Sequence, residues 1–376
     1  MQRIPWWYTE IDEAERRSLL STFEQKRFSQ GAVTDEFERQ LAEALEVPYV
    51  VVTTSGTAAL TMALLALGVG PGDEVIVPAL TWIATANAAA MLGARVVLVD
   101  CLPDLPLIDP QAVRRKLTAR TKVVVPVHLN GRSCSLDELK AIAREAGVAI
   151  VEDACKALAS RGPNGYLGTL GDLGCYSLGM ISLISIGYGG VVVTRNARLY
   201  KKLLLIRNQG VPRTGKEWYF TLGFNFKSSD LLAGIGLAQL SRIHEKLQHI
   251  HGLYERYTEG LAPLRSLSII PVKTASGEVP LCIEVRSTRR GAIMAYLERY
   301  GVETLKFHLP LHRAKYLANG GDFPNASRFA REGFILPCGP SQAPTNVGRC
   351  IQLVREWEAS APRRSRVALV DREAGV

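Results

Sequence analysis

The chain has 376 residues, of which 47% are hydrophobic and 22% charged, an ordinary balance for a globular protein with room for two or three domains. No apolar run reaches the roughly 20 residues that a membrane-spanning helix needs. The net charge of +9 comes from dispersed basic residues, which argues against nucleic-acid binding and favours an anionic small-molecule ligand, for example a nucleotide-linked one.

The first residues and the cysteines bear on where the protein is found. The opening stretch, MQRIPWWYTEIDEAERR, contains acids and no apolar segment, so it does not resemble a signal peptide. The seven cysteines form no CxxC pair; they are Cys101, Cys134, Cys155, Cys175, Cys282, Cys338 and Cys350. This scatter predicts reduced thiols in a cytoplasmic protein, with neither disulfides nor a metal site.

In chain order, the first two thirds of the sequence alternate between short apolar strands and helices. Residues 1–30 are expected to form a short helical arm. Helices are then expected over 34–45, 55–67, 84–92 and 136–145, and strands over 49–53, 74–78, 96–99, 122–127, 148–151 and 190–194. This alternation predicts an α/β fold with a parallel sheet covered by helices on both faces and right-handed crossovers.

The pattern changes after residue 201. A helix over 230–250 is expected to lead into strands within 266–285, followed by helices over 289–300 and 346–358. We therefore expect an N-terminal arm (1–30), a large domain (31–249), a smaller C-terminal α+β domain (250–360) and a mobile tail (361–376).

Three segments near the carboxyl ends of the expected strands carry candidate ligand-binding residues, since ligands of such sheets bind at that edge. Gly56 and Thr57 follow Ser55 at a helix start, where backbone N–H groups can hold an anion or Ser55 can simply cap the helix. Asp153 ends a strand and could pair with a pyridine nitrogen or cap a turn. Trp82 could stack on a flat ring or pack in the core.

Many ordered segments of the chain resemble the DegT/DnrJ/EryC1/StrS family of sugar aminotransferases, which have the aspartate aminotransferase fold and use pyridoxal phosphate (PLP). Among them are TTSGTAALTMALLALGVGPGDEVIVPALTWIATANAAAMLGA, VEDACKALAS, LGDLGCYSLGM and GFNFKSSDLLAGIGLAQL, within residues 5–360. The resemblance implies a large domain with a mostly parallel sheet, which binds the cofactor, and a smaller α+β domain.

The resemblance also implies roles for individual residues. Gly56, Thr57 and Ser177 would hold the cofactor phosphate, and Trp82 would stack on the pyridine ring while Asp153 pairs with its nitrogen. Asn225, in GFNF, resembles an asparagine that reaches the phosphate in the neighbouring subunit. The family resemblance therefore implies a homodimer.

The chain departs from the family at the residue that normally binds the cofactor covalently. The family usually reads SFHxxKxxxxGEGG, whereas this chain reads SLGMISLISIGYGG with the spacing preserved. Ser182 thus stands at the lysine position, Gly179 at the histidine and Tyr188 at the acidic residue. Because a hydroxyl cannot form an imine with an aldehyde, we expect PLP or its amine form PMP to bind non-covalently, if at all, and ordinary transamination to be lost.

A second departure places a lysine, Lys156, where the family usually has glutamine, near the phenolic oxygen of the ring. Lys156 could pair with the phenolate, point to solvent or an anionic substrate, or reach the aldehyde carbon and replace the lost lysine. His128, His308 and His312 align near the substrate entrance of the family. Each taken singly is more readily explained as a structural histidine, and only His128 is kept as a catalytic candidate.

Three functional hypotheses follow. The first is a diverged enzyme of sugar, cyclitol or secondary-metabolite (antibiotic) biosynthesis that binds PLP, PMP or a substrate–cofactor adduct non-covalently. The second is an aminotransferase that uses Lys156. The third is a cofactor-free protein, such as the partner subunit of an active homologue or a repurposed scaffold. The retained Asp153, Trp82, Ser177 and Asn225 favour the first, and the apolar run 180–186 favours the third.

Overall fold

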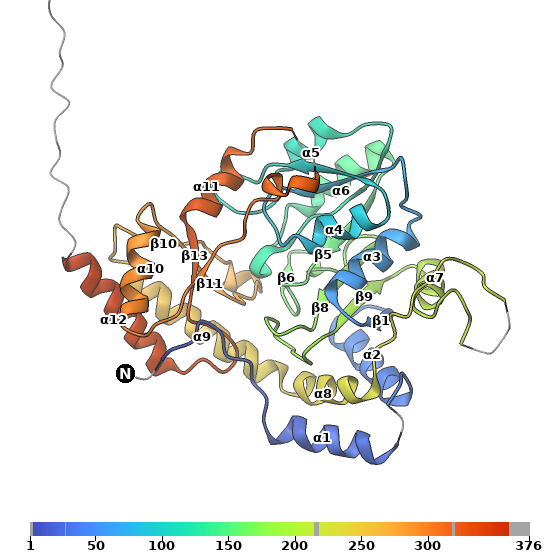
Figure 1. The fold of residues 1–376 in the computed structure, drawn as a ribbon, viewed down its shortest axis with the longest axis horizontal. Coiled ribbons are helices and arrows are strands. Elements are labelled where there is room, and N and C mark those ends of the chain that lie inside the picture. The colour runs from blue at the N-terminus through green and yellow to red at the C-terminus, as the bar shows by residue number, and fades with distance from the viewer. Residues whose placement is uncertain (1–2, 27, 214–217, 318–319, 361–376) are drawn as a thin grey trace, which may run out of the picture.

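A computed structural model describes residues 3–26, 28–213, 218–317 and 320–360. A seven-stranded sheet surrounded by helices lies beside a smaller four-stranded sheet with its own helices (Figure 1). This is the aspartate aminotransferase-like α/β architecture that the sequence predicted. The expected tail, 361–376, lies outside the described residues. Within the described ranges, no helix combines the length and the apolar character that a bilayer crossing requires.

The large sheet is mostly parallel, with strand order β1-β9-β8-β5-β4-β2-β3. Its strands are β1 (Tyr49–Thr53), β2 (Glu74–Pro78), β3 (Arg95–Val99), β4 (Thr121–Val124), β5 (Ala149–Asp153), β8 (Leu173–Ser177) and β9 (Gly190–Thr194). The sequence predicted strand 190–194 but wrongly placed it in a parallel series. β9 is antiparallel to both neighbours, because the loop 178–189 joins it directly to β8 without the crossover that parallel strands need.

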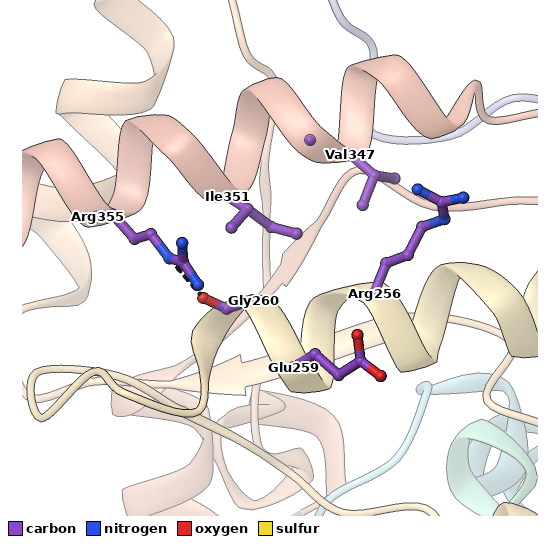
Figure 2. A pocket seen from close by; sticks show the side chains of 7 residues that line it. Arg256, Glu259, Gly260, Val347, Ile351 and Arg355 are labelled. Atoms are coloured by element: carbon purple, nitrogen blue, oxygen red, sulfur yellow. Dashed lines mark hydrogen bonds between the residues drawn. The ribbon is translucent and has the colours of Figure 1, made fainter.

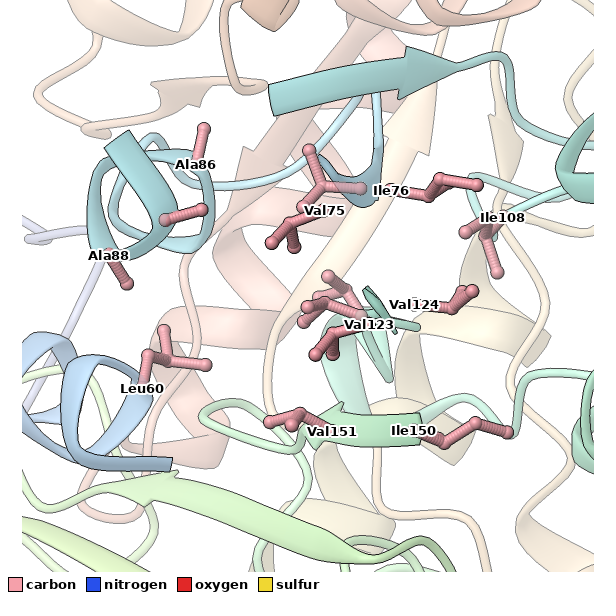
Figure 3. Packing of buried hydrophobic residues seen from close by; sticks show 14 of the residues in the cluster. Leu60, Val75, Ile76, Ala86, Ala88, Ile108, Val123, Val124, Ile150 and Val151 are labelled. Carbon is pink, nitrogen blue, oxygen red and sulfur yellow. The ribbon is translucent and has the colours of Figure 1, made fainter. Parts of the chain in front are cut away.

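The valines of β1 show why helices cover both faces of the sheet. Successive strand residues point to opposite faces. Accordingly Val51 packs in the core that includes α3 (Gly56–Ala66), whereas Val50 and Val52 pack in the core that includes α2 (Ala32–Ala44). Farther along the sheet, valines and isoleucines of β2, β4 and β5 fill the first core, beside Leu60 of α3 (Figure 3).

The remaining helices of this part are α1 (Glu13–Glu24), α4 (Ala84–Met91), α5 (Pro110–Lys116), α6 (Leu136–Ala146), α7 (Ala197–Arg207), α8 (Asp230–Ser241) and α9 (Ile243–Leu261), and a short hairpin comprises β6 (Arg161–Gly162) and β7 (Gly165–Tyr166). The single helix predicted over 230–250 is wrong, because the chain leaves helical geometry at Arg242, with φ −108° and ψ 17°. The Arg242 guanidinium pairs there with Glu10, Asp12 and Glu15. The helix α9 continues across residues 249 and 250, where the sequence placed the domain boundary.

The small sheet is antiparallel, with strand order β10-β11-β13-β12. Its strands are β10 (Ser268–Ile269), β11 (Ile283–Arg286), β12 (Leu305–Lys306) and β13 (Gly333–Leu336), and α10 (Arg290–Arg299), α11 (Pro324–Glu332) and α12 (Pro344–Ser360) complete this part. The N-terminal segment crosses to it, because Ile4 bridges to Val302 and Trp7 to Cys338. Only 13–24 of the expected helical arm is helical in α1.

Candidate active site

The candidate anion seat lies where β1 runs into α3. Ser55 caps this helix, since its hydroxyl accepts a hydrogen bond from the N–H of Ala58 at 3.1 Å. The cap leaves the N–H groups of Gly56 and Thr57 in the first turn, where backbone donors have no partner within the helix. The two alternatives for this segment are therefore compatible, because a capped helix start still offers N–H groups to an anion.

Gly56 brings three distant segments together. A Cβ added at this position would lie 3.0 Å from Cys155 Sγ and 3.1 Å from Ser177 Cβ, so a side chain there would collide with both. The Ser177 hydroxyl, at the end of β8, accepts a hydrogen bond from the N–H of Gly179 at 3.2 Å. The structure thus places Ser177 against the start of α3, as a shared phosphate seat requires.

Asp153 lies next to this seat at the end of β5 and is only 4% exposed. Its Oδ2 accepts a hydrogen bond from Thr85 Oγ1 at 2.7 Å, and its Oδ1 accepts one from the N–H of Cys155 at 3.1 Å. Both carboxylate oxygens are thus held in place by donors from neighbouring segments. Sequence reasoning missed Thr85; the signal was a hydroxyl three residues after Trp82, one helical turn along the start of α4.

Trp82 is exposed rather than packed in the core, with 62% of its surface accessible. Its indole meets the imidazole of His308 edge-on, with ring centroids 5.9 Å apart and an interplanar angle of 63°. The Trp82 carbonyl also accepts a hydrogen bond from Thr85 at 3.1 Å, which ties the indole's backbone to the partner of Asp153. An open aromatic face therefore lies beside the buried carboxylate.

Ser182 is buried, with 2% of its surface exposed, on the loop between β8 and β9. Its hydroxyl oxygen has no hydrogen-bond partner within the described part of the chain. An unsatisfied buried polar atom costs about 1–3 kcal/mol, so this hydroxyl fits a pocket that a bound molecule completes. The apolar neighbours Leu183 and Ile184 instead pack into the two adjoining cores.

The Lys156 amine lies beside the same loop and donates a hydrogen bond to the carbonyl of Ile181, the residue before Ser182. Burial lowers the pKa of Lys156. The amine of Lys156, which follows the end of β5, therefore reaches the backbone of the loop that carries Ser182.

His128 lies beneath Asp153 and is fully buried. Its Nδ1 accepts from the N–H of Cys134 at 3.3 Å, so the proton is on Nε2, which donates to Glu152 at 2.8 Å. Glu152 also accepts hydrogen bonds from three backbone N–H groups, at 2.6–2.8 Å, those of Gly168, Leu170 and Gly171. Both ring nitrogens of His128 are therefore occupied, and the geometry favours the structural alternative.

Burial acts to raise the pKa of Glu152, but the hydrogen bonds from His128 and from the backbone hold it below its usual range. A buried ionised carboxylate with four donors thus supports the strand end that carries Asp153. The sequence analysis did not single out Glu152, although it directly precedes Asp153.

Two other predicted residues lie apart from this cluster. His312 stacks on Phe323, with ring centroids 5.1 Å apart. Asn225 is exposed, and its backbone bridges to Asn208. No hydrogen bond within the described residues joins the Asn225 side chain to the cluster around Asp153.

One hollow lies apart from the cluster around Asp153. A hollow of about 310 Å³ lies between α9 and α12, lined by Arg256, Glu259, Gly260, Val347, Gly348, Ile351 and Arg355 (Figure 2). The Arg355 guanidinium donates to the Gly260 carbonyl across it, at 2.8 Å. None of these residues belongs to the cluster around Asp153. Within the described ranges, no three His, Cys, Asp or Glu side chains gather as metal ligands.

The fold is that of PLP-dependent aminotransferases. The structure of DesV from S. venezuelae, in complex with a ketimine intermediate, superimposes with a TM-score of 0.91 at 30% identity and covers 96% of this chain and 100% of that one. The PLP form of the putative sugar aminotransferase Spr1654 from Streptococcus pneumoniae gives a TM-score of 0.90 at 26% identity, over 95% and 99% of the two chains.

The chain belongs to the DegT/DnrJ/EryC1/StrS aminotransferase family, whose model matches residues 9–355. It is 34% identical over 350 residues to a GDP-perosamine synthase of Caulobacter vibrioides, which covers 91% of this chain and 94% of that protein. It is 32% identical to the dTDP-3-amino-3,4,6-trideoxy-alpha-D-glucose transaminase of Streptomyces venezuelae, over 93% of each chain.

Proposed function

We propose that this protein is a diverged family member that acts in sugar, cyclitol or secondary-metabolite biosynthesis and binds PLP, PMP or a substrate–cofactor adduct without a covalent link. The observation that carries the proposal is the unpartnered Ser182 hydroxyl, buried at the position where the family resemblance implies a lysine. The phosphate seat and the carboxylate remain assembled nearby. Names of the similar proteins support a nucleotide-linked sugar as the substrate class.

The residues present fit the cofactor. The N–H groups of Gly56 and Thr57 and the hydroxyl of Ser177 would hold its phosphate, Trp82 would cover a ring face, and Asp153 would pair with the ring nitrogen. When bound, the cofactor supplies an electron sink that stabilises negative charge on the atom attached to it. The protein is proposed to be a cytoplasmic homodimer in which Asn225 of a second copy completes the phosphate seat.

The chain's own residues prepare this site before anything binds. Thr85 and the N–H of Cys155 each donate to one oxygen of Asp153, so the carboxylate is held in one orientation. Glu152 and His128 support the strand end from below. Without an amine at Ser182, nothing on that loop competes with an incoming amine for the cofactor's aldehyde, which favours a freely exchanging cofactor.

A second candidate function is an aminotransferase in which Lys156 replaces the lost lysine. The observation in its favour is that the Lys156 amine lies at the carbonyl of Ile181, beside Ser182. We favour the non-covalent alternative because that hydrogen bond and the edge-on approach both hold the amine away from the ring face. Reaching the aldehyde would break the bond and fix a long side chain, at up to about 2 kcal/mol of entropy.

The experiment that tests the proposed function is an absorbance spectrum of purified protein with PLP, followed by dialysis with and without prior borohydride. We expect PLP to bind, to dialyse away and to leave no reduced adduct on the protein. A stable adduct would contradict non-covalent binding. Absence of any binding would instead support the cofactor-free alternative, a partner subunit or a repurposed scaffold.

A further inference from the structure

His308 brings a second nitrogen base to the neighbourhood of Lys156. It follows β12, and its imidazole meets the exposed indole of Trp82 edge-on at 5.9 Å between centroids. No hydrogen bond within the described part of the chain engages either ring nitrogen of His308. The imidazole is half-buried, so it can present a nitrogen to a molecule that rests against Trp82.

Lys156 approaches the same space from the end of β5. Its amine is held by the Ile181 carbonyl, next to the unpartnered hydroxyl of Ser182. Burial, and to a smaller extent the positive charge of Lys156, lower the pKa of His308 to about 4. The same Asp153 strand end joins both side chains, because Asp153 accepts a hydrogen bond from Thr85, whose N–H donates to the carbonyl of Trp82, the residue that His308 contacts. A positive charge on Lys156 therefore disfavours a second one on His308.

The other titratable groups around the Lys156 amine are Asp153 and the thiols of Cys155, Cys282 and Cys338. Both oxygens of Asp153 are already hydrogen-bonded to Thr85 and to a backbone N–H. Burial raises the pKa of Cys155 and of Cys338 well above the usual range, so these two thiols stay neutral. The Lys156 amine donates one hydrogen bond directly to the Ile181 carbonyl. The other two of its three N–H donors remain available for a ligand.

We propose that Lys156 and His308 form the acid–base pair of this site, and that they hold one proton between them and exchange it with a ligand bound against Trp82. The pair's proton is on the Lys156 amine. In the exchange an N–H bond of the Lys156 ammonium breaks, its electron pair stays on the nitrogen, and the proton forms a new bond to a basic atom of the ligand. The reverse step returns the proton to the amine. His308 stays neutral and offers a lone pair to a ligand hydroxyl or amine.

The acid–base pair rests on the proposed function, which supplies the ligand. It adds to that function a proton-transferring amine at residue 156, whereas position 182 has none. Lys156 does not have to leave the Ile181 carbonyl to act in this way, as it would for a covalent link. The burial that lowers its pKa also suits an amine that must release a proton near neutral pH.

The first test measures the pair without any ligand. In protein labelled with ¹³C-histidine, the His308 resonance, identified by its loss in His308→Gln, should stay in the neutral form from pH 8 down to pH 5. In Lys156→Gln the pH midpoint of the His308 titration should rise by about one pH unit, because a neighbouring positive charge is removed. Lys156→Arg keeps the charge and should leave His308 unchanged. An unmoved His308 in Lys156→Gln would overturn the pair.

The second test asks whether Lys156 is a base that faces the ligand. Trace acetylation followed by peptide mass spectrometry should modify Lys156 at a lower pH than the exposed Lys306, and PMP, which has no aldehyde, should protect Lys156 but not Lys306. Equal pH dependence of the two lysines overturns the proton-transfer role. PMP that binds without protecting Lys156 overturns the placement. If neither PMP nor PLP binds, the proposed function fails, while the His308 titrations still test the pair.

Discussion

At the scale of single residues, the buried hydroxyl of Ser182 lies next to the Ile181 carbonyl, to which the Lys156 amine donates a hydrogen bond. Under the proposed function, position 182 carries a hydroxyl, and the nearby amine belongs to Lys156. Three predictions belong to this scale. Two distinguish loss of the covalent link to PLP from its relocation to Lys156, and the third tests the hydrogen-bond network around Glu152.

The first prediction concerns covalent capture. After PLP and borohydride, peptide mapping should find no adduct on the peptide that carries Ser182, since serine has no amine, and none on Lys156, whose amine is held by Ile181. Ordinary transamination with glutamate or glutamine as donor should also be absent. A PLP-modified Lys156, lost together with turnover in Lys156→Ala, would establish the relocated-lysine aminotransferase instead.

The second prediction restores the family pattern. The double variant Ser182→Lys with Lys156→Gln should bind PLP through a link that borohydride fixes on residue 182. Ser182→Lys alone should do so less completely, because Lys156 places a second amine nearby and competes for the space. Lys156→Gln alone is the matched control and should give no adduct. If the double variant folds and binds PLP but forms no adduct, the loop does not direct residue 182 toward the ring.

The third prediction concerns Glu152, which supports the Asp153 strand end. Glu152→Gln should lower the free energy of unfolding by about 3 kcal/mol at pH 7, because a buried ionic hydrogen-bond network loses its charge. The folded-state pKa of Glu152 lies below that of the unfolded chain, about 4.3. Its stabilisation is therefore complete above that pH and is lost as the pH falls through the folded value.

Urea unfolding of both proteins from pH 7 to about pH 2.5 provides the measurement, and the two curves should run parallel above about pH 4.3 and converge below it. The exposed Glu356→Gln is a suitable control, since that side chain lies on the surface of α12. A difference that stays constant with pH would mean that the wild-type carboxylate is not the ionised form of the network.

At the scale of elements, the loop between β8 and β9 carries Ser182 and packs side chains into two hydrophobic cores. Leu183 packs in the core of the small sheet, whereas Ile184 and Ile186 pack in the core beside α2. These apolar residues have a packing explanation that does not require an emptied cofactor pocket. The N-terminal segment holds the loop as well, since Trp7 Nε1 donates to the Met180 carbonyl at 2.9 Å.

We expect Trp7→Phe to loosen this loop selectively. The change keeps an aromatic ring but removes one of the two donors to the Met180 carbonyl, the other being the Thr9 hydroxyl at 3.2 Å, a loss of about 1 kcal/mol. Hydrogen exchange of the amides in 178–189 should quicken while the sheet amides keep their protection. Trp6→Phe, whose indole N–H makes no hydrogen bond within the described residues, is the control. Equal effects of the two changes would contradict a specific role for the Trp7 bond.

At the scale of the whole molecule, the exposed position of Asn225 fits a site completed by a second copy. Its neighbour Phe226 accepts a hydrogen bond through its carbonyl from Thr53, at the end of β1, at 2.9 Å. Asn225 therefore sits on a segment anchored to the strand that leads to the phosphate seat, with its own side chain facing outward.

We therefore expect a homodimer with composite sites. Light scattering at micromolar concentration should give twice the mass of the chain, and Asn225→Ala should weaken PLP binding by about tenfold, the loss of one charge-assisted hydrogen bond. Asn208→Ala, on the facing side of the same backbone bridge, serves as the comparison. A monomer whose PLP affinity is unaffected by Asn225→Ala would refute the composite site.

The sequence by itself determined the local elements and the chemistry of the conspicuous residues. Apolar strands alternating with helices established the α/β class, since the period of two and the turn signals are local properties. The absence of an amine at position 182 is likewise a matter of residue type, and no fold can restore it.

The tertiary structure alone decided which residues meet. The reversal of β9 depends on a direct loop connection, and the break at Arg242 depends on three carboxylates from the N-terminal segment. Thr85 became a partner of Asp153 only because α4 packs its first turn against the end of β5. Both ring nitrogens of His128 are engaged, one with Glu152 and the other by the N–H of Cys134. Such pairings depend on distances across the fold, which residue spacing along the chain does not encode.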